Sequence, residues 1–147
     1  MYLHELDYFV KQTLRVKYHI RYCDDFVVLS QNKQYLENLI PKIDAFLKIR
    51  LKMSLHPNKV TIRKYSQGVD FLGYVSFPNF TILRVKTKKR MLKRVEFRLI
   101  NFCDGLITKD SLEATLLSYF GMIKHCNAFS VKQELLELVA SFGYKFD

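Results

Sequence analysis

The chain has 147 residues and a formal net charge of +10, with 24 Lys and Arg residues against 14 Asp and Glu. Apolar residues make up 49% of it, including 12 Phe and 9 Tyr, which is enough for a packed core and excludes a disordered basic tail. No uncharged apolar run approaches the roughly 20 residues of a membrane-spanning helix, and the N-terminus is not a signal peptide. The basic balance predicts a polyanionic partner, either nucleic acid or an anionic membrane surface.

The cysteines and histidines give no sign of a metal centre. The three cysteines lie far apart without a C-x-x-C pair, and the four histidines show no H-x-x-x-H spacing. These spacings argue against a zinc site and against a disulfide framework. A reducing, cytoplasmic environment fits such a sequence best.

The chain begins with a helix and a hairpin. Apolar residues at three-to-four spacing predict an amphipathic helix over residues 2–14. Two β-prone runs, 18–22 and 26–30, then flank the acidic residues Asp24 and Asp25. This pattern predicts a β-hairpin with the two acids at its tip.

A second helix and further strands follow. Asn32 is a suitable N-cap for an amphipathic helix that extends to Leu51, and Pro41 is expected to kink it or divide it. The sequence then predicts a turn and three strands, over residues 56–59, 60–63, 69–77 and 80–85. The order of helix, hairpin, helix and strands is typical of an α+β layer.

The last part of the sequence predicts three helices, the first of them strongly basic. Between Arg84 and Arg98 there are eight basic residues against one acid, Glu96. Gly105 is a suitable terminator for this helix. Capping-box patterns predict the starts of the next two helices, at Asp110 with Glu113 and at Ser130 with Gln133.

The adjacent acids have two interpretations. Two neighbouring carboxylates repel each other, and a bound divalent cation such as Mg²⁺, which prefers oxygen ligands, would remove that cost. The alternative is a solvated turn, where Asp is common. The dipeptide alone favours the solvated turn.

The surroundings of the acids resemble reverse transcriptases. Residues 22–25 (YCDD) match the Y-x-D-D motif of these enzymes, and residues 71–74 (FLGY) resemble their primer-grip hairpin. Residues 56–59 (HPNK) look like the P-x-K turn that precedes the primer grip. Residues 118–125 are similar to a thumb segment of bacterial retroelement enzymes, the group II intron, retron and diversity-generating types. Together these motifs identify the C-terminal part of such an enzyme.

The resemblance implies two-metal nucleotidyl transfer with Mg²⁺. Asp24 would be the metal-binding carboxylate and Asp25 its catalytic neighbour, also a metal ligand. Tyr22 would pack near the primer terminus. Lys59 would stabilise or protonate the leaving group, although an ordinary solvated lysine is an equal alternative.

The resemblance also implies contacts with a duplex of RNA template and DNA primer. The FLGY residues Phe71, Leu72, Gly73 and Tyr74 would place the primer end, unless they form a plain core hairpin. The basic helix would lie against the phosphates, through Lys86, Lys88, Lys89, Arg90, Lys93, Arg94 and Arg98. A solvated face is the alternative for these cations, but the eight basic residues between Arg84 and Arg98 would repel one another without a polyanion nearby.

The implied architecture is a partial polymerase palm, an antiparallel sheet with two helices over residues 1–85, followed by a three-helix thumb over 86–147. Polymerases of this kind hold a further metal-binding aspartate on an earlier strand, whereas only Glu5 and Asp7 precede the hairpin here. We therefore expect the chain alone to be inactive and to need the fingers and the other half of the palm. An exposed palm surface would favour self-association.

Two other classes of function compete with a polymerase fragment that uses dNTPs. The first is a non-catalytic nucleic-acid-binding module built on a palm and thumb scaffold. The second is a basic protein of the membrane surface, which we set aside because no helix combines a Trp- and Phe-rich apolar face with one polybasic side.

Overall fold

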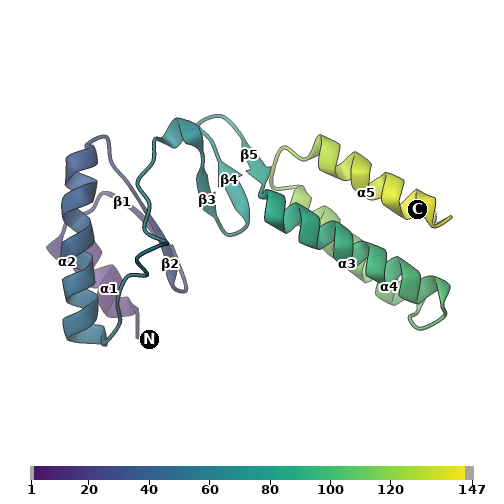
Figure 1. Cartoon of the computed structure of the whole chain (residues 1–147), viewed down its shortest axis with the longest axis horizontal. Coiled ribbons are helices and arrows are strands. Elements are labelled where there is room, and N and C mark those ends of the chain that lie inside the picture. The colour runs from purple at the N-terminus through teal and green to yellow at the C-terminus, as the bar shows by residue number, and fades with distance from the viewer. Residues whose placement is uncertain (1, 145–147) are drawn as a thin grey trace. The chain divides into compact units, whose positions relative to one another are not determined.

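The computed structural model describes residues 2–144, and the chain forms two compact units (Figure 1). We call Met1–Lys64 the hairpin unit and Tyr65–Asp147 the helical unit. Both contain helices and a small antiparallel sheet, so the α+β class is confirmed. The expected functional division into 1–85 and 86–147 stays a prediction. No helix among the described residues is both long enough and apolar enough to cross a membrane.

As far as residue 51, the hairpin unit follows the predicted order of elements. The first helix consists of α1 (His4–Tyr8) and a π-helical turn, η1 (Phe9–Thr13). Strands β1 (Tyr18–Tyr22) and β2 (Asp25–Leu29) form the predicted hairpin, and α2 (Lys33–Leu51) follows.

Helix α2 is continuous through its proline. The Asn32 side chain caps the helix as predicted, since its oxygen accepts a hydrogen bond from the Tyr35 N–H at 3.0 Å. The expectation that Pro41 would divide the helix is wrong. Pro41 is exposed, so water can solvate the carbonyl group that loses its helical partner.

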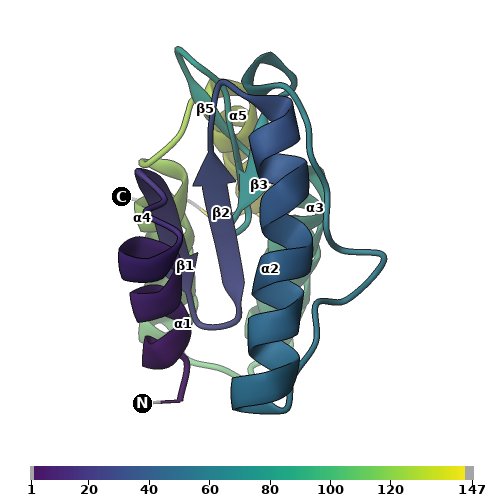
Figure 2. The same ribbon diagram turned by 90° about the vertical axis from the view of Figure 1, so that its left-hand side faces the viewer.

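The hairpin packs one face against the helices and leaves the other exposed. Phe26 and Val28 point inward, against buried residues of α1, η1 and α2 such as Leu6, Val10 and Ile43. Figure 2 shows the hairpin alongside α1 and α2. The two-residue period of a strand explains the difference between the faces, because alternate side chains point to opposite sides.

The strands that follow residue 51 differ from the sequence prediction. The expected strand over 60–63 is absent, and these residues have no regular structure. Residues 69–77 form two strands, β3 (Val69–Phe71) and β4 (Tyr74–Ser76), with β5 (Thr81–Leu83) paired to β4. The predicted single strand is interrupted because the two residues between β3 and β4 both have positive φ angles.

Three helices follow, α3 (Val85–Cys103), α4 (Lys109–Ile123) and α5 (Phe129–Ser141). The predicted stop of α3 at Gly105 is confirmed, because Gly105 has a φ of 71°. The Leu106 N–H donates to Asn101 O at 2.8 Å and the Gly105 N–H donates to Phe102 O at 3.0 Å. This pair of bonds is a Schellman motif.

The predicted capping boxes of α4 and α5 are wrong. Helix α4 begins earlier than expected, because the Thr108 side chain accepts a hydrogen bond from the Ser111 N–H at 3.3 Å. Glu113 is thus free to accept a hydrogen bond from the Tyr144 hydroxyl at 2.7 Å. Helix α5 begins before Ser130 and has no side-chain cap.

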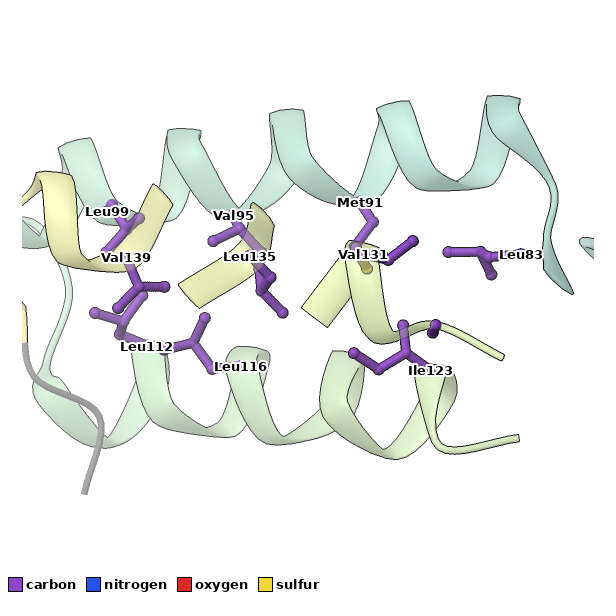
Figure 3. Packing of buried hydrophobic residues seen from close by; sticks show 11 residues of the cluster. Leu83, Met91, Val95, Leu99, Leu112, Leu116, Ile123, Val131, Leu135 and Val139 are labelled. Carbon is purple, nitrogen blue, oxygen red and sulfur yellow. The ribbon is translucent and has the colours of Figure 1, made fainter. Parts of the chain in front are cut away.

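The three helices share one apolar core with β5. Figure 3 shows the buried side chains of α3 pointing toward those of α4 and α5. The main residues of this core are Leu83 from β5, Met91, Val95 and Leu99 from α3, Leu112, Leu116 and Ile123 from α4, and Val131, Leu135 and Val139 from α5. The i, i+4 spacing of these residues accounts for the predicted helices.

Candidate functional site

The acidic pair lies at the tip of the hairpin, as predicted. The last strand pair is Tyr22 with Asp25, so Cys23 and Asp24 form a two-residue loop. Cys23 has a φ of 52°, in the left-handed region that tight hairpin loops require. Asp24 and Asp25 are both exposed, and neither carboxylate has a hydrogen bond or ion pair with the described residues. Both carboxylates are therefore available to a ligand.

The loop is tied to the first helix by Arg21. The Arg21 Nε donates to Asp7 Oδ1 at 2.7 Å and its Nη2 donates to Asp7 Oδ2 at 2.5 Å. Its Nη1 donates to the carbonyl oxygen of Cys23 at 2.6 Å. The hydrogen bonds from Arg21 hold the pKa of Asp7 below its usual value, and the same bonds raise the pKa of Arg21. The guanidinium thus bridges α1 and the peptide that precedes Asp24.

Sequence reasoning did not assign a role to Arg21 or Asp7. The strand alternation puts Arg21 on the inner face of the hairpin with His19, where a charged residue needs a partner. That unusual position is the signal that could have found Arg21. Nothing in the spacing indicates Asp7 as its partner, because several acids of the chain could serve.

His19 is the other polar residue of this inner face. Its ring lies 5.9 Å from the Phe26 ring, and its Nε2 is buried without a hydrogen-bond partner among the described residues. Burial lowers the pKa of His19, although the nearby Asp7 opposes the shift. The inner face therefore favours a neutral His19.

Tyr22 lies on the opposite, outer face of the hairpin. Its side chain is 59% exposed, and Tyr18, Ile20 and Leu29 on the same face are exposed as well. We call this exposed apolar surface the outer face; it consists of Tyr18, Ile20, Tyr22 and Leu29.

Lys59 belongs to the predicted turn. The Lys59 N–H donates to His56 O at 3.0 Å, and the Asn58 N–H donates to His56 Nδ1 at 3.3 Å. The Lys59 side chain is exposed, and no ion pair joins it to Asp24 or Asp25 in the part of the chain that is described. The turn is confirmed, while the role of Lys59 stays a prediction.

The FLGY segment forms the β3–β4 turn. Phe71 and Tyr74 are the last strand pair, and Leu72 and Gly73 between them have φ angles of 53° and 86°. Two positive φ angles define a type I′ loop. The Tyr74 hydroxyl donates to Met122 O at 2.9 Å, so this residue links the sheet to the end of α4.

The same turn contacts the start of α3. Gly73 O accepts a hydrogen bond from the Arg84 N–H at 2.9 Å. A Cβ atom at Gly73 would lie 3.1 Å from Thr87 Oγ1, closer than about nine in ten real Cβ contacts. Gly73 therefore allows the close approach of the turn to the first turn of the basic helix. Thr87 is a residue that sequence reasoning did not single out.

The cations of α3 fall into two groups. Lys88 forms an ion pair with Glu134, Arg98 donates to Ser111 O at 2.8 Å, and Arg94 lies 5.8 Å from the centre of the Phe97 ring. The other four are exposed and have no hydrogen bond or ion pair with any described residue. We call this second group the basic face; it consists of Lys86, Lys89, Arg90 and Lys93.

The basic face is not neutralised by its own helix. The first turn of α3 contains no acid, although the positive end of the helix dipole disfavours cations there. Spacings of three and four residues place Lys86, Lys89, Arg90 and Lys93 on one side of the helix. A polyanion such as a phosphate backbone would relieve both sources of repulsion.

The donor set at the hairpin tip suits a hard divalent cation but is incomplete. Carboxylate oxygens are the ligands that Mg²⁺ prefers. Among residues 2–144, no three His, Cys, Asp or Glu side chains gather closely enough to hold a metal ion. Asp24 and Asp25 thus fit the chemistry of a magnesium site to which further ligands would have to be added.

These features define an α+β protein with an exposed carboxylate pair and a separate cationic face. Residues 1–76, just over half of the chain, match the family of reverse transcriptases (RNA-dependent DNA polymerases). The chain belongs to this family, whose catalysis depends on metal ions and whose substrates are nucleic acids.

A fungal relative supports a retroelement origin. A protein of Saccharomyces cerevisiae described as the COX1/OXI3 intron 2 protein is 36% identical to the chain over 58 residues. This match covers 39% of the chain and 7% of the yeast protein, so the chain corresponds to a small part of that relative.

Proposed function

We propose that the chain supplies half of the palm and the thumb of an RNA-directed DNA polymerase of a bacterial type of retroelement. The observation that carries this proposal is the exposed Asp24–Asp25 pair at the tip of a two-residue hairpin loop, in a chain of the reverse transcriptase family. Residues 1–85 would act as the partial palm and residues 86–147 as the thumb.

Asp24 and Asp25 would hold Mg²⁺ together with a further carboxylate from outside these 147 residues. Bound cations would activate the primer 3′-hydroxyl and stabilise the leaving pyrophosphate. The exposed Lys59 would add positive charge near the triphosphate of the dNTP. Tyr22, on the outer face, would pack near the primer terminus.

The β3–β4 turn would place the primer end. We assign direct contact to Leu72 and Gly73 at the tip. Phe71 and Tyr74 would hold that tip in place, because Phe71 is half-buried and the Tyr74 hydroxyl is bonded to Met122 O. The contact between Gly73 and Thr87 would fix the primer end relative to the basic helix.

The basic face would bind the phosphates of the duplex between RNA template and DNA primer. Its four cations have no partner among the described residues, so binding releases counterions from the duplex without first breaking ion pairs of the protein. Lys88, Arg94 and Arg98 would play a smaller part, because each already has a neighbour within the helical unit.

The rest of the outer face, which consists of Tyr18, Ile20 and Leu29, would pack against the remaining half of the palm or against a second copy of the chain. Tyr18 and Ile20 are each more than half exposed, at 55% and 57%. Burying this apolar area would favour association, at roughly 25 cal/mol per Å² removed from water.

The experiment uses the parent reading frame with its upstream segment. We expect Asp24→Asn and Asp25→Asn each to lower primer extension by at least about 100-fold, the cost of losing a charge that stabilises the transition state, with duplex affinity unchanged. Asp110→Asn, in the first turn of α4, is the matched control. Extension that is unaffected by both substitutions would favour the alternative, a non-catalytic nucleic-acid-binding module.

A further inference from the structure

We propose that Arg21 is a positioning residue that fixes the peptide carrying the acidic pair. This inference rests on the proposed function, because it concerns the readiness of Asp24 and Asp25 to bind a cation. Its basis is a hydrogen-bonded bridge from α1 through Asp7 and Arg21 to the carbonyl of Cys23.

The bridge uses the planar shape of the guanidinium. Nε and Nη2 bind both oxygens of Asp7 in the bidentate arrangement that arginine and carboxylate prefer. Nη1 then points to Cys23 O at 2.6 Å. Because that carbonyl belongs to the peptide bond between Cys23 and Asp24, the guanidinium holds the backbone one bond before the first acid.

The loop needs such a support. Cys23 is a non-glycine residue with a φ of 52°, a conformation that costs roughly 1–2 kcal/mol. The sheet has only two strands, and an isolated two-stranded hairpin is marginally stable in water. The bridge anchors the loop to a helix whose residues Leu6 and Val10 are buried in the core.

The bridge also pairs Arg21 with an acid that lies outside the hairpin tip. Asp7 pairs with Arg21, with side chains that are 31% and 19% exposed, so the cation is neutralised by a residue outside the acidic pair. Other charged or titratable groups near Asp7 are His4 and His19, and Lys11 lies near His19. Among the described residues, Asp24 and Asp25 thus have no ion pair with Arg21 that a metal ion would have to displace.

The first test follows the loop itself in the 147-residue chain by NMR. The Arg21→Lys variant keeps the charge but loses the planar guanidinium and its several N–H donors. We expect it to show faster hydrogen exchange and lower NMR order parameters at the amides of Cys23 and Asp24. Asp7→Asn is expected to give the same result. Unchanged order of these amides in both variants would overturn the proposal. Arg50→Lys is the matched control, because Arg50 pairs at 3.8 Å with Glu5, which lies on α1 as Asp7 does.

The second test measures the consequence with Mn²⁺ as a paramagnetic probe. We expect Mn²⁺ to broaden the amide signals of Asp24 and Asp25, with an apparent affinity about 10-fold lower in Arg21→Lys. A purely structural role for Arg21 would lower the melting temperature and leave Mn²⁺ affinity as in the wild type, which contradicts the proposal. Absence of hairpin broadening in the wild-type chain would count against the proposed function, while the exchange measurement still decides the role of Arg21.

Discussion

The two cationic regions of the molecule use their charges in opposite ways. In the hairpin unit, Arg21 is hydrogen-bonded to Asp7 and to the carbonyl oxygen of Cys23, so its charge holds the loop in place. In the helical unit, the four cations of the basic face have no partner among the described residues. The effect of the bridge depends on the shape of one side chain, that of Arg21. The effect of the basic face depends on the number of its charges.

The largest effect is expected from removing the basic face. Replacing its four cations with Gln is expected to weaken binding to a primer–template duplex by about 1,000-fold at roughly 0.1 M salt, because each lost phosphate contact lowers the slope of log K against log salt by about 0.9. Titrations at several salt concentrations measure both quantities. Binding that barely changes with salt in the wild type would contradict the assignment.

A control variant with the same net charge tests whether the basic face itself, or only the net charge of the protein, determines duplex binding. Four exposed lysines of the hairpin unit can be replaced with Gln instead, at Lys33, Lys42, Lys48 and Lys52. This variant is expected to keep most of the wild-type salt slope. Equal losses in the two variants would mean that net charge alone, and not the basic face, determines binding.

The second prediction concerns the core beneath the basic face. Leu135→Ala is expected to lower the free energy of unfolding by about 2–5 kcal/mol, because the Leu135 side chain is fully buried between α3 and α4. Denaturant unfolding followed by circular dichroism measures the change. Leu106→Ala is the control at a side chain that is 71% exposed and is expected to change stability by less than about 0.5 kcal/mol.

The third prediction separates the two units by pH. Burial lowers the pKa of His19 from 6.5, so the folded hairpin unit binds fewer protons than the unfolded chain and loses stability as the pH falls below 6.5. In the helical unit, the hydrogen bond from Tyr144 lowers the pKa of Glu113 from 4.5, so its contribution is lost only below pH 4.5.

Amide exchange recorded residue by residue between pH 7.5 and 4 distinguishes these cases. Exchange in β1 and β2 is expected to quicken, after correction for intrinsic rates, at a higher pH than exchange in α4. His19→Gln removes the first change and Tyr144→Phe weakens the second. If the hairpin unit of His19→Gln still loses stability below pH 6.5, a group other than His19 causes the loss, and the prediction is wrong.

The sequence predicts local features of the candidate site better than its connections. The hairpin with Asp24 and Asp25 is predictable because alternation and a two-residue loop are local properties. The bridge to Asp7 is not, because it joins residues that are 14 positions apart and depends on how the hairpin packs against α1. The prediction of a strand over 60–63 is wrong for a related reason, because alternation of apolar and polar residues cannot show whether a pairing strand is present.

The helix ends show the same limit. Gly105 was predictable because a left-handed stop favours glycine wherever it occurs. The capping box at Asp110 failed because Thr108, two residues earlier, offers a side-chain oxygen that accepts from the Ser111 N–H and caps the helix there. Local patterns thus show which residues can cap a helix, but they do not show which of two neighbouring candidates does.

The smallest predicted effect compares the tips of the two hairpins. Cys23 and Leu72 have nearly equal φ angles, 52° and 53°, and both are exposed. Asn tolerates this conformation better than either, so Cys23→Asn and Leu72→Asn are each expected to raise the free energy of unfolding by about 0.5–1 kcal/mol. Val is expected to lower it at both positions, because a β-branched side chain is strained there. A Val variant as stable as the Asn variant, measured by urea unfolding, would mean that the loop relaxes out of the left-handed conformation, and at Cys23 this would also break the bond between its carbonyl and Arg21.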